Sequence, residues 1–136
     1  MKKDKQFTPY KTDEEVITAF KNIQSRIDTN LKKMFINTPK TKFEIRQTEA
    51  FREASASAEY VQGSADGSRP GIFYVPIIDA KTFNSTSGME SLFLHEAIPG
   101  HHYQVSLQQE NTSLPKFRRF LWYGAYGEGW ALYTES

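Results

Sequence analysis

The chain has 136 residues, a formal net charge of +1 at pH 7 and no cysteine. This length suits a single domain with its own core, and the balanced charge gives no indication of nucleic acid or an anionic membrane as partner. The lack of cysteine excludes disulfides and thiolate zinc sites but leaves the compartment unknown. No apolar run is long enough to span a membrane, and residues 1–15 have no apolar signal-peptide segment.

The N-terminal part predicts a long amphipathic helix over residues 13–35. Thr12 and Glu15 have the spacing of a capping box, in which a hydroxyl is followed three residues later by a carboxylate. From there the apolar positions recur at steps of three and four, as one face of a helix requires: Val16, Phe20, Ile23, Ile27, Leu31 and Met34. The sequence Asn-Thr-Pro at residues 37–39 ends this helical pattern.

Residues 42–79 predict strands and turns. Residues 42–46 alternate polar and apolar side chains, as a strand with one buried face does. Residues 50–62 fit either a loop or a short helix, and residues 66–71, DGSRPG, have turn chemistry. Residues 72–75 predict a short strand, and Pro76 marks it as an edge strand or as the end of a strand, because proline cannot donate to a ladder.

The C-terminal part predicts two further helices, over residues 87–110 and 115–136. A second capping box at residues 87–90 opens the first, and Pro115 suits the first turn of the second. The last helix reaches Ser136 without a stop signal. We therefore expect residues 1–136 to form one domain that is part of a larger one, of class α+β and mostly α, with long amphipathic helices and a small edge-strand element.

All three histidines lie in one octapeptide, HEAIPGHH, at residues 95–102. Two histidines four apart on a helix share a face and can bind zinc beside the intervening glutamate. His95 and His101 are six apart, about 240° around a regular helix. If Pro99 and Gly100 bulge out of the helix, the four-residue spacing is recovered. We therefore predict His95 and His101 as ligands and Glu96 as general base.

The last helix supplies a candidate third ligand. Seven-residue steps from Leu121, on its apolar stripe, reach Glu128 and Glu135, so both carboxylates occupy the inward face. A buried unpaired carboxylate is costly and needs a cation or another partner. Glu128 is thus a predicted metal ligand, and Glu135 is a predicted acceptor for a histidine N–H. His102 is predicted separately, as a neighbour of the site that donates to a ligand or faces the substrate. The alternatives for Glu128 are an ion pair with a nearby arginine, Arg118 or Arg119, and the capping of a helix break at the flanking glycines, Gly127 and Gly129.

The motifs HEAIPGHHYQ and YGEGWALYTE resemble those of the bacterial domain-of-unknown-function 885 family, a group inferred to be zinc metallopeptidases. Residues 66–75 and 42–46 are also similar to that family. The resemblance implies a gluzincin-like fold related to neurolysin and carboxypeptidase-Taq type peptidases. It also implies Zn²⁺ held by His95, His101 and Glu128, with Glu96 as base. It further implies a full protein several times longer than this chain, whose bacterial relatives are often exported or lipid-anchored.

The leading hypothesis is zinc-dependent hydrolysis of a peptide substrate, with strand 72–75 binding an extended peptide by strand addition. Arg69 is a candidate partner for a substrate carboxylate. One rival is a non-catalytic metal-binding module, an enzyme-like fragment that folds without turnover. Another is a helical interaction module whose histidines are incidental. Exposed apolar surface also predicts self-association.

Overall fold

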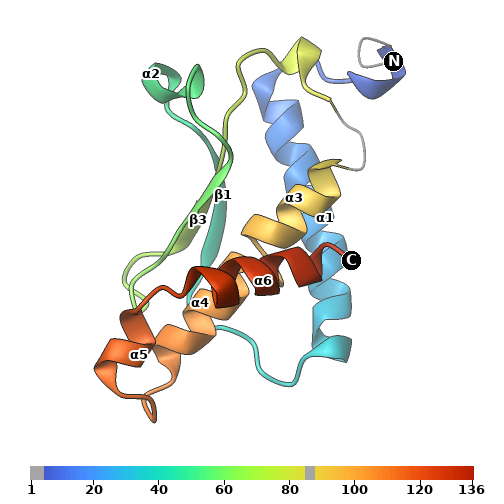
Figure 1. Ribbon diagram of the computed structural model, residues 1–136. Helices are drawn as coiled ribbons and strands as arrows, with labels where there is room; N and C mark the ends of the chain where they lie inside the picture. Colours follow the sequence, from blue (N-terminus) through green and yellow to red (C-terminus); the bar gives the residue numbers. More distant parts are fainter. Residues whose placement is uncertain (1–4, 85–87) are drawn as a thin grey trace.

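The computed structural model describes residues 5–84 and 88–136 (Figure 1). Helices predominate over a small sheet, which confirms the α+β, mostly α class. No helix in the described residues is long and apolar enough to span a membrane. The second predicted capping box begins at Ser87, outside the described residues. The elements in chain order are η1 (Lys5–Phe7), α1 (Asp13–Met34), β1 (Phe43–Gln47), α2 (Ala50–Glu53), β2 (Glu59–Val61), β3 (Gly71–Val75), η2 (Ala80–Thr82), α3 (Gly88–Glu96), α4 (His101–Glu110), α5 (Lys116–Phe120) and α6 (Gly124–Thr134).

Helix α1 starts where its capping residues place it. The Thr12 side chain accepts a hydrogen bond from the Glu15 backbone N–H at 3.3 Å, which satisfies one of the free amides of the first turn. The helix ends at Met34, five residues before Pro39. Its buried face carries four of the predicted apolar residues, which are Val16, Phe20, Ile23 and Leu31.

The sheet has the strand order β1-β3-β2, with β1 parallel and β2 antiparallel to β3. The central position of β3 shows that the edge-strand prediction for residues 72–75 was wrong. Pro76 follows the last residue of β3, so its missing N–H costs no ladder bond, and the strand-end alternative holds. Residues 59–61, within the segment that the sequence left open, form the outer strand β2.

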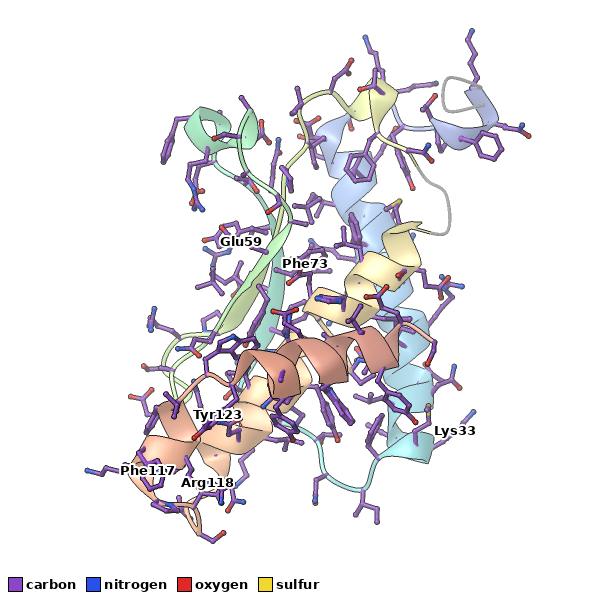
Figure 2. The ribbon with its side chains drawn as sticks, viewed as in Figure 1. Lys33, Glu59, Phe73, Phe117, Arg118 and Tyr123 are labelled. Atoms are coloured by element: carbon purple, nitrogen blue, oxygen red, sulfur yellow. The ribbon has the colours of Figure 1, made fainter. Side chains whose placement is uncertain are left out.

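The core lies between the sheet and helices α1 and α3, which cover the same side of it (Figure 1). Phe73 points from β3 towards these helices (Figure 2). Its ring meets Phe20 of α1 edge-on at a centroid distance of 5.4 Å and Phe93 of α3 at 6.3 Å. All three rings are completely buried, and each contributes about 2–3 kcal/mol of hydrophobic stabilisation. This cluster anchors α3, the helix that carries His95.

Both C-terminal helices are interrupted, whereas the sequence predicted each as one element. The predicted helix 87–110 is divided into α3 and α4 by residues 97–100, where proline and glycine disfavour continuous helix. The predicted helix 115–136 is divided into α5 and α6 at residues 121–123. There the Leu121 carbonyl accepts a hydrogen bond from the Gln108 side chain at 3.2 Å, a contact between helices that helical periodicity does not reveal.

Candidate metal centre

Three side chains from three helices converge on one point: His95 of α3, His101 of α4 and Glu128 of α6. Nε2 of His95 lies 3.4 Å from Oε2 of Glu128. Nε2 of His101 lies 3.6 Å from the same oxygen. One ligand atom from each residue lies within 4.8 Å of the other two. The three residues form a group able to hold a metal ion.

The turn between α3 and α4 brings the two histidines together. Helix α3 ends at Glu96, the chain reverses over residues 97–100, and α4 begins at His101. The two imidazole rings stand nearly perpendicular, at 88°, with their centroids 4.7 Å apart. A break between two helices, rather than a bulge inside one, therefore gives the convergence that the sequence argument required.

Gly100 allows the close approach of the two helices. A Cβ placed on Gly100 would lie 1.9 Å from the backbone oxygen of His95 and 2.2 Å from that of Leu94. Real Cβ atoms do not come so close to backbone, so any larger residue would push α4 away from α3. The Trp130 indole N–H donates to the Pro99 carbonyl at 2.7 Å, which ties the turn to α6. The turn therefore also fixes the helix that carries Glu128.

The other ring nitrogen of His95 has a carboxylate partner. Nδ1 of His95 lies 2.7 Å from Oε1 of Glu135, and the Ser91 hydroxyl donates to Oε2 of Glu135 at 2.5 Å. The Ser91 hydrogen bond and, next, the His95 contact hold the pKa of Glu135 below its usual range. A carboxylate bonded to Nδ1 leaves Nε2 free for a metal and increases the basicity of the ring.

His101 is buried and carries the Trp122 indole against it, with ring centroids 5.4 Å apart. Burial lowers the pKa of His101, because the charged imidazolium is poorly solvated there. The neutral ring that results is the form that binds metals. Nδ1 of His101 has no hydrogen-bond partner among the described residues. Two nitrogens and one carboxylate oxygen match the ligand type of catalytic zinc sites.

Glu96 lies beside the three ligands. It lines a hollow of about 390 Å³ together with them and with Tyr60 and Trp122. Burial raises the pKa of Glu96, although the neighbouring His95 opposes the shift. A carboxylate with a raised pKa next to a metal group is better suited than an ordinary one to accept and release a proton.

His102 turns away from this hollow. Its Nδ1 lies 3.0 Å from the Tyr60 hydroxyl and 3.4 Å from the Ser106 hydroxyl. Its ring stacks near Phe43, with centroids 5.0 Å apart. Burial lowers the pKa of His102 to about 4, so the ring is neutral at physiological pH. The residue joins α4 to strand β2.

Two predictions that involve arginine remain: Arg69 as a substrate contact, and an arginine as the ion-pair partner of Glu128. Arg69 lies exposed in the turn before β3 and is not among the residues lining the hollow at the metal group; its role in substrate binding stays a prediction. Among the described residues, the ion-pair partners of Glu128 are His95 and His101. The alternative pairing with an arginine is thus not formed, and the Arg119 guanidinium instead donates to the Gln109 carbonyl.

Sequence reasoning missed two contributors to this site, Ser91 and Tyr60. Ser91 lies one helical turn before His95, a spacing that could have suggested a shared contact. Tyr60 lies in the segment that the sequence left open, so it had no signal. Both depend on contacts between segments distant in the chain.

The comparisons with known proteins identify the family of the chain. The chain matches, over residues 1–136, the family described as "Bacterial protein of unknown function (DUF885)". The chain belongs to this family. No curated protein matches it.

One solved structure has the same fold over nearly the whole chain. It is described as "The crystal structure of the putative lipoprotein from Colwellia psychrerythraea". The two share 30% sequence identity with a TM-score of 0.92, and the match covers 98% of this chain. The chain spans only 23% of the Colwellia protein.

Proposed function

We propose that this chain carries the zinc centre of a metallopeptidase, with His95, His101 and Glu128 as ligands and Glu96 as general base. The observation that carries the proposal is the convergence of three ligand atoms within 4.8 Å from three separate helices. Three separate features assemble this group: the break between α3 and α4, the close approach at Gly100 and the Glu135 carboxylate on His95. Together they argue against a chance cluster of acidic and basic residues. The family motifs support the same assignment.

The residues fit zinc on chemical grounds. Two imidazole nitrogens and one carboxylate oxygen leave a fourth position open, as catalytic sites do. Zn²⁺ bound there would activate water and polarise a substrate carbonyl. Glu135 holds the His95 ring in orientation through Nδ1, which is the usual arrangement around zinc-binding histidines.

The proposed role of Glu96 is proton transfer. Its carboxylate takes a proton from the attacking water and later delivers that proton to the departing amine of the peptide. A partly buried position and a raised pKa suit both halves of this cycle, because the carboxylate must also hold the proton for a time. Trp122 and Tyr60 form the adjacent walls of the hollow.

Strand β2 replaces β3 as the proposed edge for substrate. It is an outer strand of the sheet, and residues 58–60 and 62 line the hollow beside Glu96. An extended peptide added to that edge would form main-chain hydrogen bonds that do not depend on its sequence. Its scissile bond would then lie near the metal group.

The proposal also includes a gluzincin-like fold for the complete peptidase domain and a location in the cell envelope. The fold match to a protein described as a lipoprotein supports envelope association of a full-length relative. Self-association of the isolated chain stays a prediction, to be checked by light scattering.

The test is a comparison of wild type and Glu96→Gln, both saturated with Zn²⁺, on a mixed library of peptides read out by mass spectrometry. The proposal expects hydrolysis by wild type, loss of hydrolysis in Glu96→Gln, and equal zinc content in both. Glu90→Gln, which alters an exposed ion pair on α3, is the matched control and should retain activity.

Two results would favour the rival classes. Stoichiometric zinc without hydrolysis that depends on Glu96 would indicate a metal-binding module. Zinc binding that is absent, or unaffected by His95→Ala, would indicate a helical interaction module with incidental histidines.

A further inference from the structure

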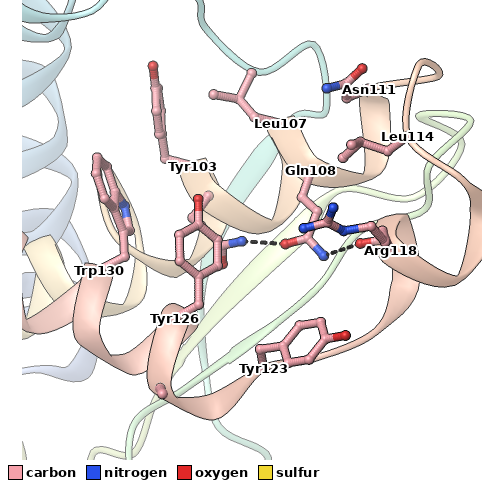
Figure 3. A pocket seen from close by; sticks show the side chains of 11 residues that line it. Tyr103, Leu107, Gln108, Asn111, Leu114, Arg118, Tyr123, Tyr126 and Trp130 are labelled. Atoms are coloured by element: carbon pink, nitrogen blue, oxygen red, sulfur yellow. Dashed lines mark hydrogen bonds between the residues drawn. The ribbon is translucent and has the colours of Figure 1, made fainter.

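A second hollow, of about 860 Å³, lies between α4, α5 and α6 (Figure 3). We call it the aromatic groove. Its wall on α6 includes Ala125 and the aromatic pair Tyr126 and Trp130, which lie one helical turn apart. Its wall on α4 includes Tyr103 and Leu107, and Leu114 lies between α4 and α5. The groove is therefore built mainly from large apolar and aromatic side chains.

The groove is distinct from the metal group, although both use α6. Tyr126 and Trp130 line the aromatic groove, whereas Glu128 lines the smaller hollow at the metal group. An occupant of the groove would contact both α6 and α4 and so restrain the helix that carries Glu128. It would do so without touching the ligands.

Two glutamines of the groove take part in a chain of hydrogen bonds. The Gln104 side-chain amide donates to the Gln108 side-chain oxygen at 2.6 Å, and the Gln108 amide donates to the Arg118 carbonyl at 2.6 Å, which joins α4 to α5 (Figure 3). Oε1 of Gln104 is buried and has no hydrogen-bond partner among the described residues. Apart from this oxygen, the groove offers an occupant mainly apolar surface and one cation, the Arg118 guanidinium.

Several aromatic side chains in and beside the groove are more than half exposed to solvent. Tyr126 is 60% and Tyr123 is 52% exposed, and Phe117 on α5 is 64% exposed. Phe117 and Tyr123 lie close to Arg118 at the same end of the molecule (Figure 2). Contiguous apolar surface of this kind marks a binding surface.

We propose that the aromatic groove receives a helix from the part of a longer polypeptide that lies outside this fold. The Colwellia protein contains the same fold, at a TM-score of 0.92, in a chain of which the match covers 23%. More than three quarters of that chain is therefore available to cover the surfaces of the matched region. A groove lined by side chains of α4 and α6 suits a third helix, because the side-chain ridges of one helix pack into the grooves that its neighbours present.

The charge of the groove specifies one feature of the occupant. Among the described residues, no carboxylate lies within ion-pair distance of Arg118. The occupant is thus an amphipathic helix with an apolar face and an aspartate or glutamate opposite Arg118. A second copy of this chain is a poorer fit, because a two-fold interface through the groove would bring two Arg118 side chains towards each other.

The first test superposes this fold on the Colwellia crystal structure. The proposal expects a helix from outside the matched region to contact the positions equivalent to Tyr103, Leu107, Tyr126 and Trp130. Solvent at those positions, or a second molecule packed against them, would overturn it.

The second test uses this chain in solution with a synthetic peptide copied from that covering helix. Isothermal titration calorimetry should show binding by wild type and at least a tenfold loss of affinity in Tyr126→Glu and in Arg118→Glu. Tyr126 is mostly exposed, so far-UV circular dichroism should show both variants folded. Ile36→Glu, at a fully exposed position on another part of the chain, should bind as wild type does.

Three results would overturn the proposal. The peptide fails to bind, or it binds Tyr126→Glu and wild type equally, or light scattering shows a dimer that Tyr126→Glu dissociates. The last result would assign the groove to a second copy instead. None of these measurements requires zinc or hydrolysis, so their outcome is independent of whether the proposed function is correct.

Discussion

Nδ1 of His95 lies 2.7 Å from Oε1 of Glu135, a contact that joins the end of α3 to the residue that follows α6. The same imidazole presents its Nε2 to Glu128, 3.4 Å away. One histidine ring therefore connects both carboxylates of the last helical segment. The orientation of His95 is fixed before any metal binds, which reduces the free energy that ordering the site would cost.

Glu135→Gln should weaken zinc binding by about 10- to 100-fold, because the outer carboxylate supplies charge and orientation to the His95 ring. The glutamine keeps an oxygen near Nδ1 but removes the negative charge. Competition with a chromophoric chelator measures the affinity. The control is Glu90→Gln, which removes the same charge from an exposed ion pair and should leave the affinity within about a factor of two. Equal losses in the two variants would contradict the specific role of Glu135.

Gly100→Ala should lower both stability and zinc affinity. The added Cβ would meet the His95 backbone oxygen at 1.9 Å, so α4 must move and His101 with it. We expect a loss of about 2–4 kcal/mol in the free energy of unfolding, measured by urea denaturation, and at least tenfold weaker zinc binding.

Gly129→Ala is the matched control for this effect. A Cβ on Gly129 meets nothing within 4 Å, and the position lies within α6 next to Glu128. Alanine there should stabilise the protein by about 0.5–1 kcal/mol through helix propensity and leave zinc affinity unchanged. A destabilised Gly129→Ala or an unaffected Gly100→Ala would show that the turn geometry is not as described.

Trp122 should report metal binding directly. Its ring centroid lies 5.4 Å from that of His101, and the chain has two tryptophans. Cu²⁺ binds histidine sites more tightly than Zn²⁺ does and quenches nearby indoles. In the wild-type chain, stoichiometric Cu²⁺ should quench most of the fluorescence that comes from Trp122. His101→Ala should abolish this quenching, and persistence of full quenching in that variant would place the ion elsewhere.

Asp66 should make stability depend on acid pH. Hydrogen bonds from the Ser64 side chain and, next, from Ser68 lower the pKa of Asp66 from 3.8 to about 2. A carboxylate whose pKa is lower in the folded state stabilises the fold above its unfolded pKa, and the stabilisation disappears as the pH falls from 3.8 through about 2. Asp66→Asn should therefore be less stable than wild type at neutral pH but not at about pH 2. Urea denaturation at both pH values measures this, and a constant difference would contradict it.

The local features of the fold could be predicted from sequence, because local forces determine them. The start of α1 follows from the Thr12 side chain, and its buried face follows from a repeat that has the helical period. The position of β3 in the sheet could not be predicted. It depends on pairing with residues 59–61, which precede their partners Ile72, Phe73 and Tyr74 by 11 to 15 positions, and that segment has no clear periodicity.

The residues of the candidate site could be predicted from the sequence, but the helix breaks that bring them together could not. The spacing of His95, Glu96 and His101 around a Pro-Gly pair indicated a distorted helix, and the family motifs indicated Glu128. In the structure the helix is not distorted but broken completely between α3 and α4. The break between α5 and α6 positions Trp122, and it depends on a side chain of another helix, Gln108. Helical periodicity carries no information about such a contact.

Anomalous scattering at the zinc absorption edge, from crystals of the zinc-saturated protein, would locate the bound ion. We expect one peak per chain, about 2.0–2.2 Å from Nε2 of His95, from Nε2 of His101 and from a carboxylate oxygen of Glu128. A zinc ion bound elsewhere, or no peak between these three side chains, would disprove the proposed metal centre.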